Sequence, residues 1–285
     1  MVPARVRRRG SLFAQVTPAT LFILVFAVGP LVVFLLYSFW KVSNYQIVTV
    51  WNLENYSKAL GEAVYQKAYL NTLRIAGSAA LLATLIAYLF AHAMRFHLRR
   101  WQEPLLFCVI VALFSGYLVR IFAWRTLLGE KGIINEALLS AGVIHQPLTF
   151  LLYNRLAAIV VLANFLIPLA ILPIYGVLQN LDEGEVLAAR DLGCGTFGAF
   201  RRVTLPLAWP GIAGALGLSF IIASADYLTP TLVGGVKGTM IGQPIATTFL
   251  ESFDWPAGAA IAFVTLVSTL LIVVLVRVVG NRVLR

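Results

Sequence analysis

The sequence between residues 182 and 212 reads DEGEVLAARDLGCGTFGAFRRVTLPLAWPGI, and long apolar runs lie on both sides of it. Asp182 and Glu185 have the spacing of a helix N-cap and its capping-box partner, so a short helix is expected to begin here. Gly193 is expected to end that helix, and Thr196 can cap a second one. Two short helices with a glycine joint, placed between two apolar spans, predict a docking element outside the membrane.

Part of this stretch resembles a known family. Ala188-Ala189, Gly193 and Leu205-Pro206 resemble the EAA–G–I-x-LP loop of ABC importer permeases, whose coupling helices sit in a cleft of a cytoplasmic ATPase. The family usually has Glu where this chain has Leu187. Glu185 lies roughly 200° away around a helix of 3.6 residues per turn, so it is no simple substitute. The resemblance implies a docking surface made of Glu185, Leu187, Ala188, Ala189, Arg190, Asp191, Gly193, Phe197, Leu205 and Pro206. The alternative is an amphipathic loop that binds no partner.

The composition indicates a membrane protein. Hydrophobic residues make up 60% of the chain and charged residues 12%, and the mean hydropathy is +0.87, values that a soluble domain of this length would not show. The two cysteines have no metal-ligand or disulfide pattern, since Cys108 falls in an apolar run and Cys194 in the docking stretch. We expect both to be unpaired thiols.

The apolar runs predict an all-α membrane protein with about six transmembrane helices in one permease domain, residues 18–279. Small residues recur every fourth position in two of the runs, which predicts close helix packing there; they are Ala79, Ala83, Ala87 and Ala91, and Gly211, Ala215, Ser219 and Ala223. Leu205-Pro206 is expected to close the second docking helix, because proline disfavours helix at the residue before it. The expected segments are a cytoplasmic N-terminal segment 1–17, spans near 18–40, 71–93, 104–123, 154–178, 210–228 and 257–279, a coupling loop 179–209 and a cytoplasmic tail 280–285.

The distribution of lysine and arginine predicts the orientation. Basic residues gather in the N-terminal segment, in the loop Arg95–Arg100, in the coupling loop and in the tail, so these parts are expected on the cytoplasmic side. The first apolar run is too long for a signal peptide and lacks a cleavage site. The net charge of +10 is thereby explained by topology and lipid contact, and nucleic acid is not an expected partner.

No motif indicates that the chain itself is an enzyme. Gly129-Glu130-Lys131-Gly132 lacks the spacing of a phosphate-binding loop. His92, His97 and His145 are scattered and show no metal or nucleophile pattern. No cofactor, metal or catalytic residue is therefore expected on this chain, and the energy for transport must come from a partner.

Two charges lie near the outer ends of expected spans, where charge is costly and often functional. Arg120 is in the third span and Asp226 in the fifth, at similar depth, so a buried ion pair between them is the favoured interpretation. The alternatives are that they face water on the outer side or that they line the substrate path. The candidates for that path or its gate are Tyr117, Arg120, Trp124, Asn164, Asp226 and Tyr227.

A second resemblance covers nearly the whole chain. Residues 118–124 with 132–135, and residues 226–235, are similar to the exits of the third and fifth spans in spermidine/putrescine-type permeases. That subfamily also includes permeases for aminobutyrate, opines, aminoethylphosphonate and ferric iron. The resemblance implies a multi-pass subunit of the bacterial inner membrane with both termini cytoplasmic. Its implied partners are a second homologous permease, two ABC ATPases that bind ATP and Mg, an extracytoplasmic solute-binding protein and membrane lipid.

Two other classes remain open at this stage. Half of an ion-driven secondary transporter would have broken helices and coupling acids near the membrane centre, and Asp226 is the one candidate acid. A membrane scaffold without a transport role would leave the docking stretch unexplained.

Overall fold

A computed structural model of the chain describes residues 17–18, 20–44 and 46–283. Nearly all the regular structure of the described residues is helical, apart from two short strands. The expected cytoplasmic positions of Arg5, Arg7, Arg8, Arg9 and Arg285 concern residues outside these ranges. The chain divides into two compact units, a larger one of residues 63–244 and 265–285 and a smaller one of residues 1–62 and 245–264.

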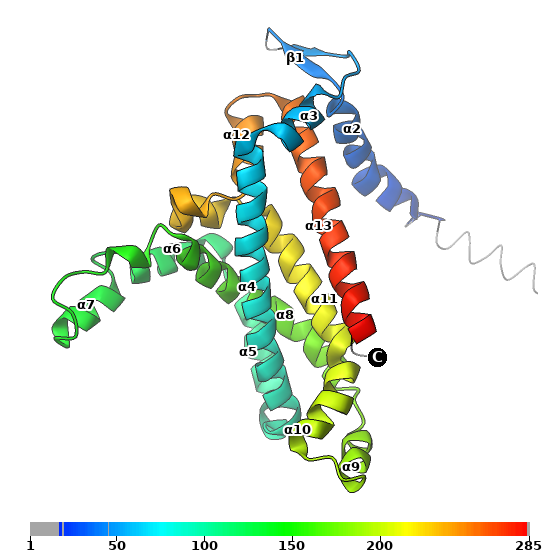
Figure 1. The fold of residues 1–285 in the computed structure, drawn as a ribbon, viewed down its shortest axis with the longest axis vertical. Helices are drawn as coiled ribbons and strands as arrows, with labels where there is room; N and C mark the ends of the chain where they lie inside the picture. The colour runs from blue at the N-terminus through cyan, green and yellow to red at the C-terminus, as the bar shows by residue number, and fades with distance from the viewer. Residues whose placement is uncertain (1–16, 19, 45, 284–285) are drawn as a thin grey trace, which may run out of the picture. The chain divides into compact units, whose positions relative to one another are not determined.

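Three helices form the core of the larger unit (Figure 1): α4 (Ala63–Phe96), α8 (Arg155–Leu178) and α11 (Leu205–Ala225). Small side chains let α4 approach its neighbours closely. Ala79, Ala83, Ala87 and Ala91 are all fully buried, in apolar clusters with residues of α8 and α11. The packing face predicted for the second span is therefore confirmed.

The small face of α11 is also confirmed. Gly211, Ala215, Ser219 and Ala223 are buried. A Cβ on Gly211 would lie 2.8 Å from the carbonyl oxygen of Pro173 in α8, so the two backbones meet where only glycine fits.

The third span is where the structure differs most from expectation. The predicted single helix over 104–123 is wrong, because α5 (Gln102–Phe114) stops and α6 (Tyr117–Leu128) starts in a new direction. The two helical segments on either side of the break are bent by 91°. Ser115 and Gly116 both have extended ψ angles, of 132° and 127°, and these two residues make the turn.

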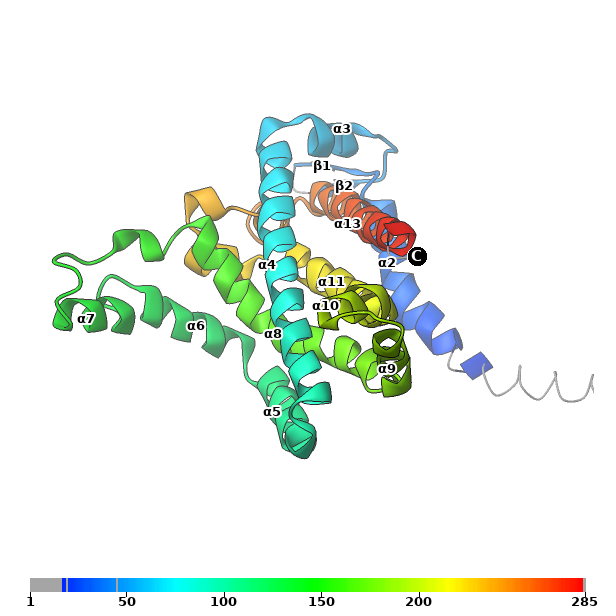
Figure 2. The same cartoon turned by 60° about the horizontal axis from the view of Figure 1, so that its bottom comes forward.

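Beyond the break, α6 leads to the short helix α7 (Ile133–Ser140), and both extend away from the core helices (Figures 1 and 2). Gly142, two residues past the end of α7, has a positive φ of 69°, as glycine often does just beyond a helix C-terminus. Short helical turns complete the larger unit at Arg99–Trp101 (η2), Thr149–Leu151 (η3), Pro230–Gly234 (η5) and Val236–Gly238 (η6).

Two helices belong partly to each unit, α12 (Gly242–Leu250) and α13 (Trp255–Val283). Near the end of α13, the Asn281 side chain accepts a hydrogen bond of 2.9 Å from the indole of Trp209. A Cβ on Gly280 would collide with the same indole. The C-terminal end of α13 is thus fixed against the first turns of α11.

The smaller unit begins with an apolar helix. Its π-helical turn η1 (Leu24–Val28) continues into α2 (Gly29–Tyr37), and none of the residues in the window Thr20–Tyr37 is buried. The strands β1 (Lys41–Ser43) and β2 (Gln46–Val48) then form an antiparallel hairpin, and α3 (Glu54–Gly61) follows.

Among the described residues, five helices are long and apolar enough to cross a membrane, or six if the bent pair α5–α6 counts as one span. This agrees with the expected all-α membrane architecture. Several helices extend past the expected limits of their spans: α4 begins at Ala63 where the expected span begins at Asn71, and the helix that contains the fifth span begins at Thr196.

Candidate functional site

The expected docking element is a pair of short helices at one end of the larger unit, here called the coupling loop (residues 179–209). Its first helix, α9 (Glu183–Asp191), begins as the sequence predicts, because the Asp182 carboxylate accepts a hydrogen bond of 2.9 Å from the backbone N–H of Gly184. No hydrogen bond from the Glu185 side chain completes a capping box within the described residues.

The joint after α9 depends on a glycine. Gly193 has a φ of 88°, and its N–H and that of Cys194 close the helix end on the carbonyls of Arg190 and Ala189. A Cβ on Gly193 would meet no atom of the chain within 4 Å. The requirement for glycine is therefore conformational here, and crowding within the chain plays no part.

The second helix differs from its prediction at both ends. It is α10 (Thr196–Ala199), and its N-cap is Gly195, not Thr196. The expected end at Leu205-Pro206 is wrong, because a π-helical turn, η4 (Phe200–Thr204), joins α10 to α11. The wide turn bonds the Leu205 N–H to the carbonyl of Phe200. Pro206 then falls in the first turn of α11, where its missing N–H costs nothing.

Large apolar side chains of the coupling loop face outward. The exposed fractions are 57% for Leu187, 87% for Leu192 and 73% for Phe197. Around them Glu185, Ala188, Arg190 and Asp191 are exposed as well. Exposed apolar side chains on a polar element are typical of a protein-binding surface.

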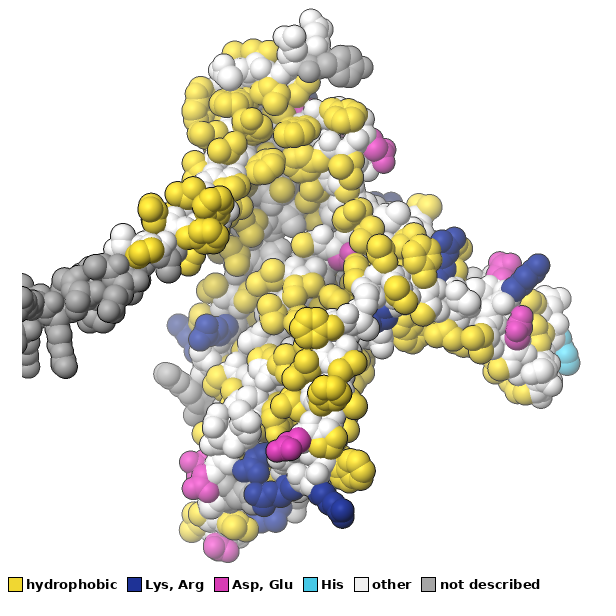
Figure 3. Space-filling view, turned by 180° about the vertical axis from the view of Figure 1, so that it is seen from behind, with side chains coloured by type: hydrophobic (Ala, Val, Ile, Leu, Met, Phe, Trp, Pro, Cys, Tyr) yellow, Lys and Arg dark blue, Asp and Glu magenta, His cyan; other side chains and the backbone are white. Residues whose placement is uncertain are grey.

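The basic loop after α4 lies beside the coupling loop. The Arg95 guanidinium donates hydrogen bonds to the carbonyls of Leu178 and Leu181, at 3.2 and 3.4 Å, where α8 ends. Basic side chains gather at this end of the larger unit, which carries α9 and α10 (Figure 3). The two segments that the positive charge assigns to one side of the membrane are thus side by side.

The second candidate region is the helix joint, which we define as Ser115-Gly116 between α5 and α6 with the side chains of Tyr117, Arg120 and Asp226. Arg120 donates hydrogen bonds to the Ala112 carbonyl and to the Ser115 hydroxyl. It therefore caps the last turn of α5, whose carbonyls have no helical partner beyond the break.

Arg120 also contacts the ring of Phe165 in α8, whose centroid lies 5.5 Å from the guanidinium carbon. Its Nη1 atom is buried and makes no hydrogen bond within the described residues. The arginine is thus held by the backbone of α5, by the Ser115 hydroxyl and by an aromatic face.

Asp226 has a different set of partners. One carboxylate oxygen accepts a hydrogen bond of 2.5 Å from the Tyr117 hydroxyl, and the other accepts bonds from the N–H groups of Leu228 and Thr229 at 3.0 and 3.5 Å. Asp226 and Arg120 form no ion pair, although the structure describes both side chains. The favoured interpretation of a buried pair is therefore wrong: each charge binds helix-end backbone instead.

The remaining path candidates are more dispersed. Trp124 packs one turn further along α6 in an apolar cluster with Ile121. Asn164 is half-buried in α8, and Tyr227 is 40% exposed. Sequence reasoning missed Phe165, whose ring centroid lies 4.6 Å from that of Tyr117. It also missed the hydroxyl of Thr229, 2.7 Å from that of Tyr117. Phe165 follows Asn164 directly, but an aromatic residue in an apolar run carries no signal of its own.

Comparison with known proteins identifies the family. Residues 5–285 match the model of the family described as binding-protein-dependent transport system inner membrane component. The chain is similar to the spermidine/putrescine transport system permease protein PotB of Haemophilus influenzae, with 36% identity over 226 residues that cover 79% of this chain and 78% of that protein. It is 34% identical to PotB of Escherichia coli over the same length, which is 82% of that protein.

A solved structure shows the same fold. It is a chain of a bacterial alginate ABC transporter in complex with an alginate pentasaccharide-bound periplasmic protein, with a TM-score of 0.77 and 16% identity over 100% of this chain and 98% of that one. The family decides against the secondary transporter and the scaffold left open by the sequence. The chain belongs to the family of binding-protein-dependent transport system inner membrane components and is a permease subunit with the type I ABC importer fold.

Proposed function

We propose that this permease is one of two homologous membrane subunits of a polyamine importer. Two ATPase subunits, which bind ATP and Mg, would drive it, and an extracytoplasmic solute-binding protein would supply its solute. The observation that carries the solute class is the 36% identity to a permease named for spermidine and putrescine, over more than three quarters of both chains.

The coupling loop supports the ATPase as partner. Leu192 and Phe197 are large, apolar and largely exposed, and they flank a joint whose shape the Gly193 backbone fixes. A complementary cleft on an ATPase would bury these side chains. Leu187, at the position where the family usually has Glu, is exposed as well, so it would also face the ATPase.

The orientation of the permease in the membrane follows from the proposed contact between the coupling loop and the ATPases. With the ATPases in the cytoplasm, the coupling loop and the adjoining Arg95–Arg100 loop are cytoplasmic. The described end of α13 shares that side, since Asn281 accepts a hydrogen bond from Trp209, the last residue of the coupling loop. The helix joint then lies between the coupling loop and the extracytoplasmic face of the membrane.

The helix joint has limited means to bind a cationic solute. The Asp226 carboxylate already accepts three hydrogen bonds, and the Arg120 guanidinium, which lies over the Phe165 ring, repels cations. The Tyr117 ring can hold an ammonium group on its face, whereas the Phe165 ring already contacts Arg120. We propose that the Tyr117 ring guides the polyamine, and that carboxylates of the binding protein and the second permease select it.

Reconstituted transport tests the proposal. The tagged permease would be purified from the cells that encode it, with the subunits that remain bound, and placed in proteoliposomes with the binding protein. We expect ATP-dependent uptake of labelled spermidine or putrescine. Uptake of aminobutyrate, an opine, aminoethylphosphonate or ferric iron in its place would overturn the solute class and leave the importer assignment intact.

A further inference from the structure

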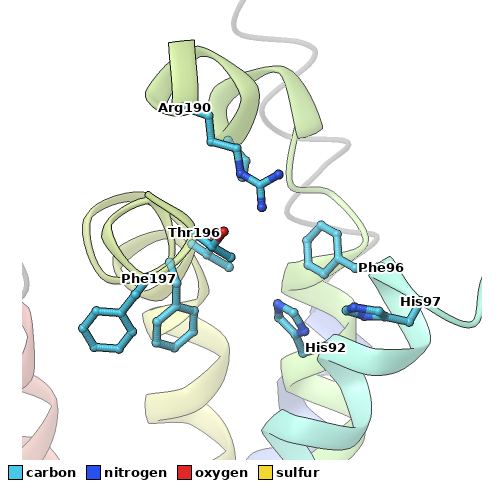
Figure 4. Close-up of a pocket in the computed structure, with 9 residues that line it drawn as sticks. His92, Phe96, His97, Arg190, Thr196 and Phe197 are labelled. Carbon is cyan, nitrogen blue, oxygen red and sulfur yellow. The ribbon is translucent and has the colours of Figure 1, made fainter. Parts of the chain in front are cut away.

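A cavity of about 630 Å³ lies behind the coupling helices, between the end of α4 and the segment from α9 to η4. Its volume falls in the range of roughly 300–1,000 Å³ typical of small-ligand sites. His92 and His97 come from the α4 side, and Arg190 from α9. Figure 4 shows these three side chains facing the same space from opposite sides.

The polar groups of this cavity have no partner within the described residues. The side chains of His92, His97 and Arg190 make no hydrogen bond or ion pair there. The two imidazole rings lie 5.9 Å apart, and the hydroxyl-bearing Thr196 faces them from α10. Several hydrogen-bond donors thus converge on one space without being used.

The charges of the residues that line the cavity indicate which kind of ligand it can bind. None of the described residues that line the cavity is Asp or Glu, whereas Arg190 is permanently cationic. The histidines donate hydrogen bonds through an N–H in either protonation state. The lining therefore suits an anion, and it repels the polyamine of the proposed function. The cavity is accordingly not a resting place for that solute.

Apolar rings complete the lining. Phe96 extends from the end of α4, where its ring centroid lies 4.7 Å from that of His92, and Phe197 extends from α10 (Figure 4). An anionic head with an apolar body would satisfy both parts. The cavity also lies at the end of the larger unit where basic side chains gather, and basic pockets between helices on the cytoplasmic side bind anionic lipid headgroups.

We propose that this cavity binds the phosphate headgroup of an anionic phospholipid of the inner leaflet. The inference rests on the proposed cytoplasmic position of the coupling loop and is independent of the solute. The phosphate would accept hydrogen bonds from Arg190 on one side and from His92 and His97 on the other, so it would bridge α4 to α9. The lipid would thereby hold the coupling helices at a fixed distance from the core.

Native mass spectrometry on the whole complex tests the site. The complex would be released from nanodiscs of phosphatidylcholine with graded amounts of phosphatidylglycerol, and the retained phosphatidylglycerol counted. We expect His97→Gln and Arg190→Gln each to weaken retention about tenfold or more, the loss expected for one hydrogen bond to a charged group. The matched control is Arg201→Gln, an exposed basic residue of the same end that does not line the cavity.

The outcomes are distinct. Weaker retention in the cavity variants with wild-type retention in Arg201→Gln supports the lipid site, and equal retention in all four proteins overturns it. Displacement of phosphatidylglycerol by millimolar inorganic phosphate would show that a free anion is the ligand, which overturns the lipid as its source. His97→Gln keeps the test valid if Arg190→Gln releases the ATPase. Because the readout needs no transport, failure of the polyamine assignment would leave it unaffected.

Discussion

The side chains singled out in the coupling loop and in the helix joint have opposite environments: the first are exposed, and the second bond to the chain itself. At the joint, Arg120 and Asp226 form hydrogen bonds with backbone groups at helix ends, so the chain itself caps these helix ends. In the coupling loop, Leu192 and Phe197 are left exposed, so this segment is incomplete without a partner. A charged residue near the end of a membrane span can thus have a structural role. An exposed apolar residue on a polar segment is the stronger sign of function.

The largest effect is expected at the joint, from Asp226→Ala. The variant loses the acceptor for the Tyr117 hydroxyl and for two backbone N–H groups. Hydrogen bonds to a charged group contribute about 1.5–3 kcal/mol each, so we expect the thermal unfolding temperature of the purified complex to fall by several degrees. Asp226→Asn keeps one acceptor oxygen and should lose less.

The same two variants distinguish a structural Asp226 from one that lines the path. If the Asp226→Ala complex is as stable as the wild type but no longer transports, the carboxylate acts on the solute. The comparison between the two regions would then fail, because the joint would also be incomplete without a ligand.

A smaller effect is expected from Gly193→Ala in the coupling loop. A residue with a side chain pays about 1–2 kcal/mol for the left-handed conformation that Gly193 adopts at a φ of 88°. Gly195→Ala is the matched control, because that glycine has a φ of −62° and equally open space around its Cβ position. We expect only Gly193→Ala to reduce ATP-dependent uptake. Equal uptake by the two variants would mean that the shape of the joint does not matter for coupling.

A still smaller effect is expected from Leu187→Glu. The side chain is 57% exposed in the chain alone, so a carboxylate can remain hydrated there and the complex should keep its ATPase. The measurement is the amount of ATPase retained through detergent purification. Loss of the ATPase would show that its cleft has adapted to an apolar residue, where a buried unpaired charge costs several kcal/mol.

The smallest effect concerns the smaller unit. Hydrogen bonds from Lys41 and Lys58 lower the pKa of Glu54 from 4.5 to about 2. Since the folded pKa is depressed, the stabilising contribution is complete above pH 4.5 and is lost as the pH falls towards 2. We expect the difference in unfolding temperature between wild type and Glu54→Gln to shrink across that range. A difference that stays constant with pH would contradict the assigned contacts.

The sequence predicted the helices and their packing faces well, because spacing alone carries that information. The fully buried alanines of α4 and the buried small face of α11 both follow from a four-residue repeat. The break at Ser115-Gly116 was missed, because the apolar run continues across it without a proline. At Leu205-Pro206 the proline predicted a helix end that is not there. A π-helical turn accommodates the proline, so the helix continues.

The coupling loop was easier to predict than the helix joint. Its helix cap and glycine conformation are local, so Asp182 and Gly193 reveal them in the sequence. The partners of Arg120 and Asp226 depend on how distant helices meet. The similar depth of Arg120 and Asp226 in the membrane indicated an ion pair, but depth does not define the direction in which a side chain points. At the 91° bend, Arg120 points back towards α5.

Retention of the ATPase by coupling-loop variants tests the central claim most directly. Phe197→Asp and Leu192→Asp place a charge on the exposed apolar surface of the loop, and Val236→Asp does the same at a site that is 93% exposed in η6. All three complexes would be purified through a tag on the permease. We predict that the first two lose the ATPase and that Val236→Asp retains it at the wild-type level. Full retention by Phe197→Asp and Leu192→Asp would contradict the claim that this loop is the docking surface.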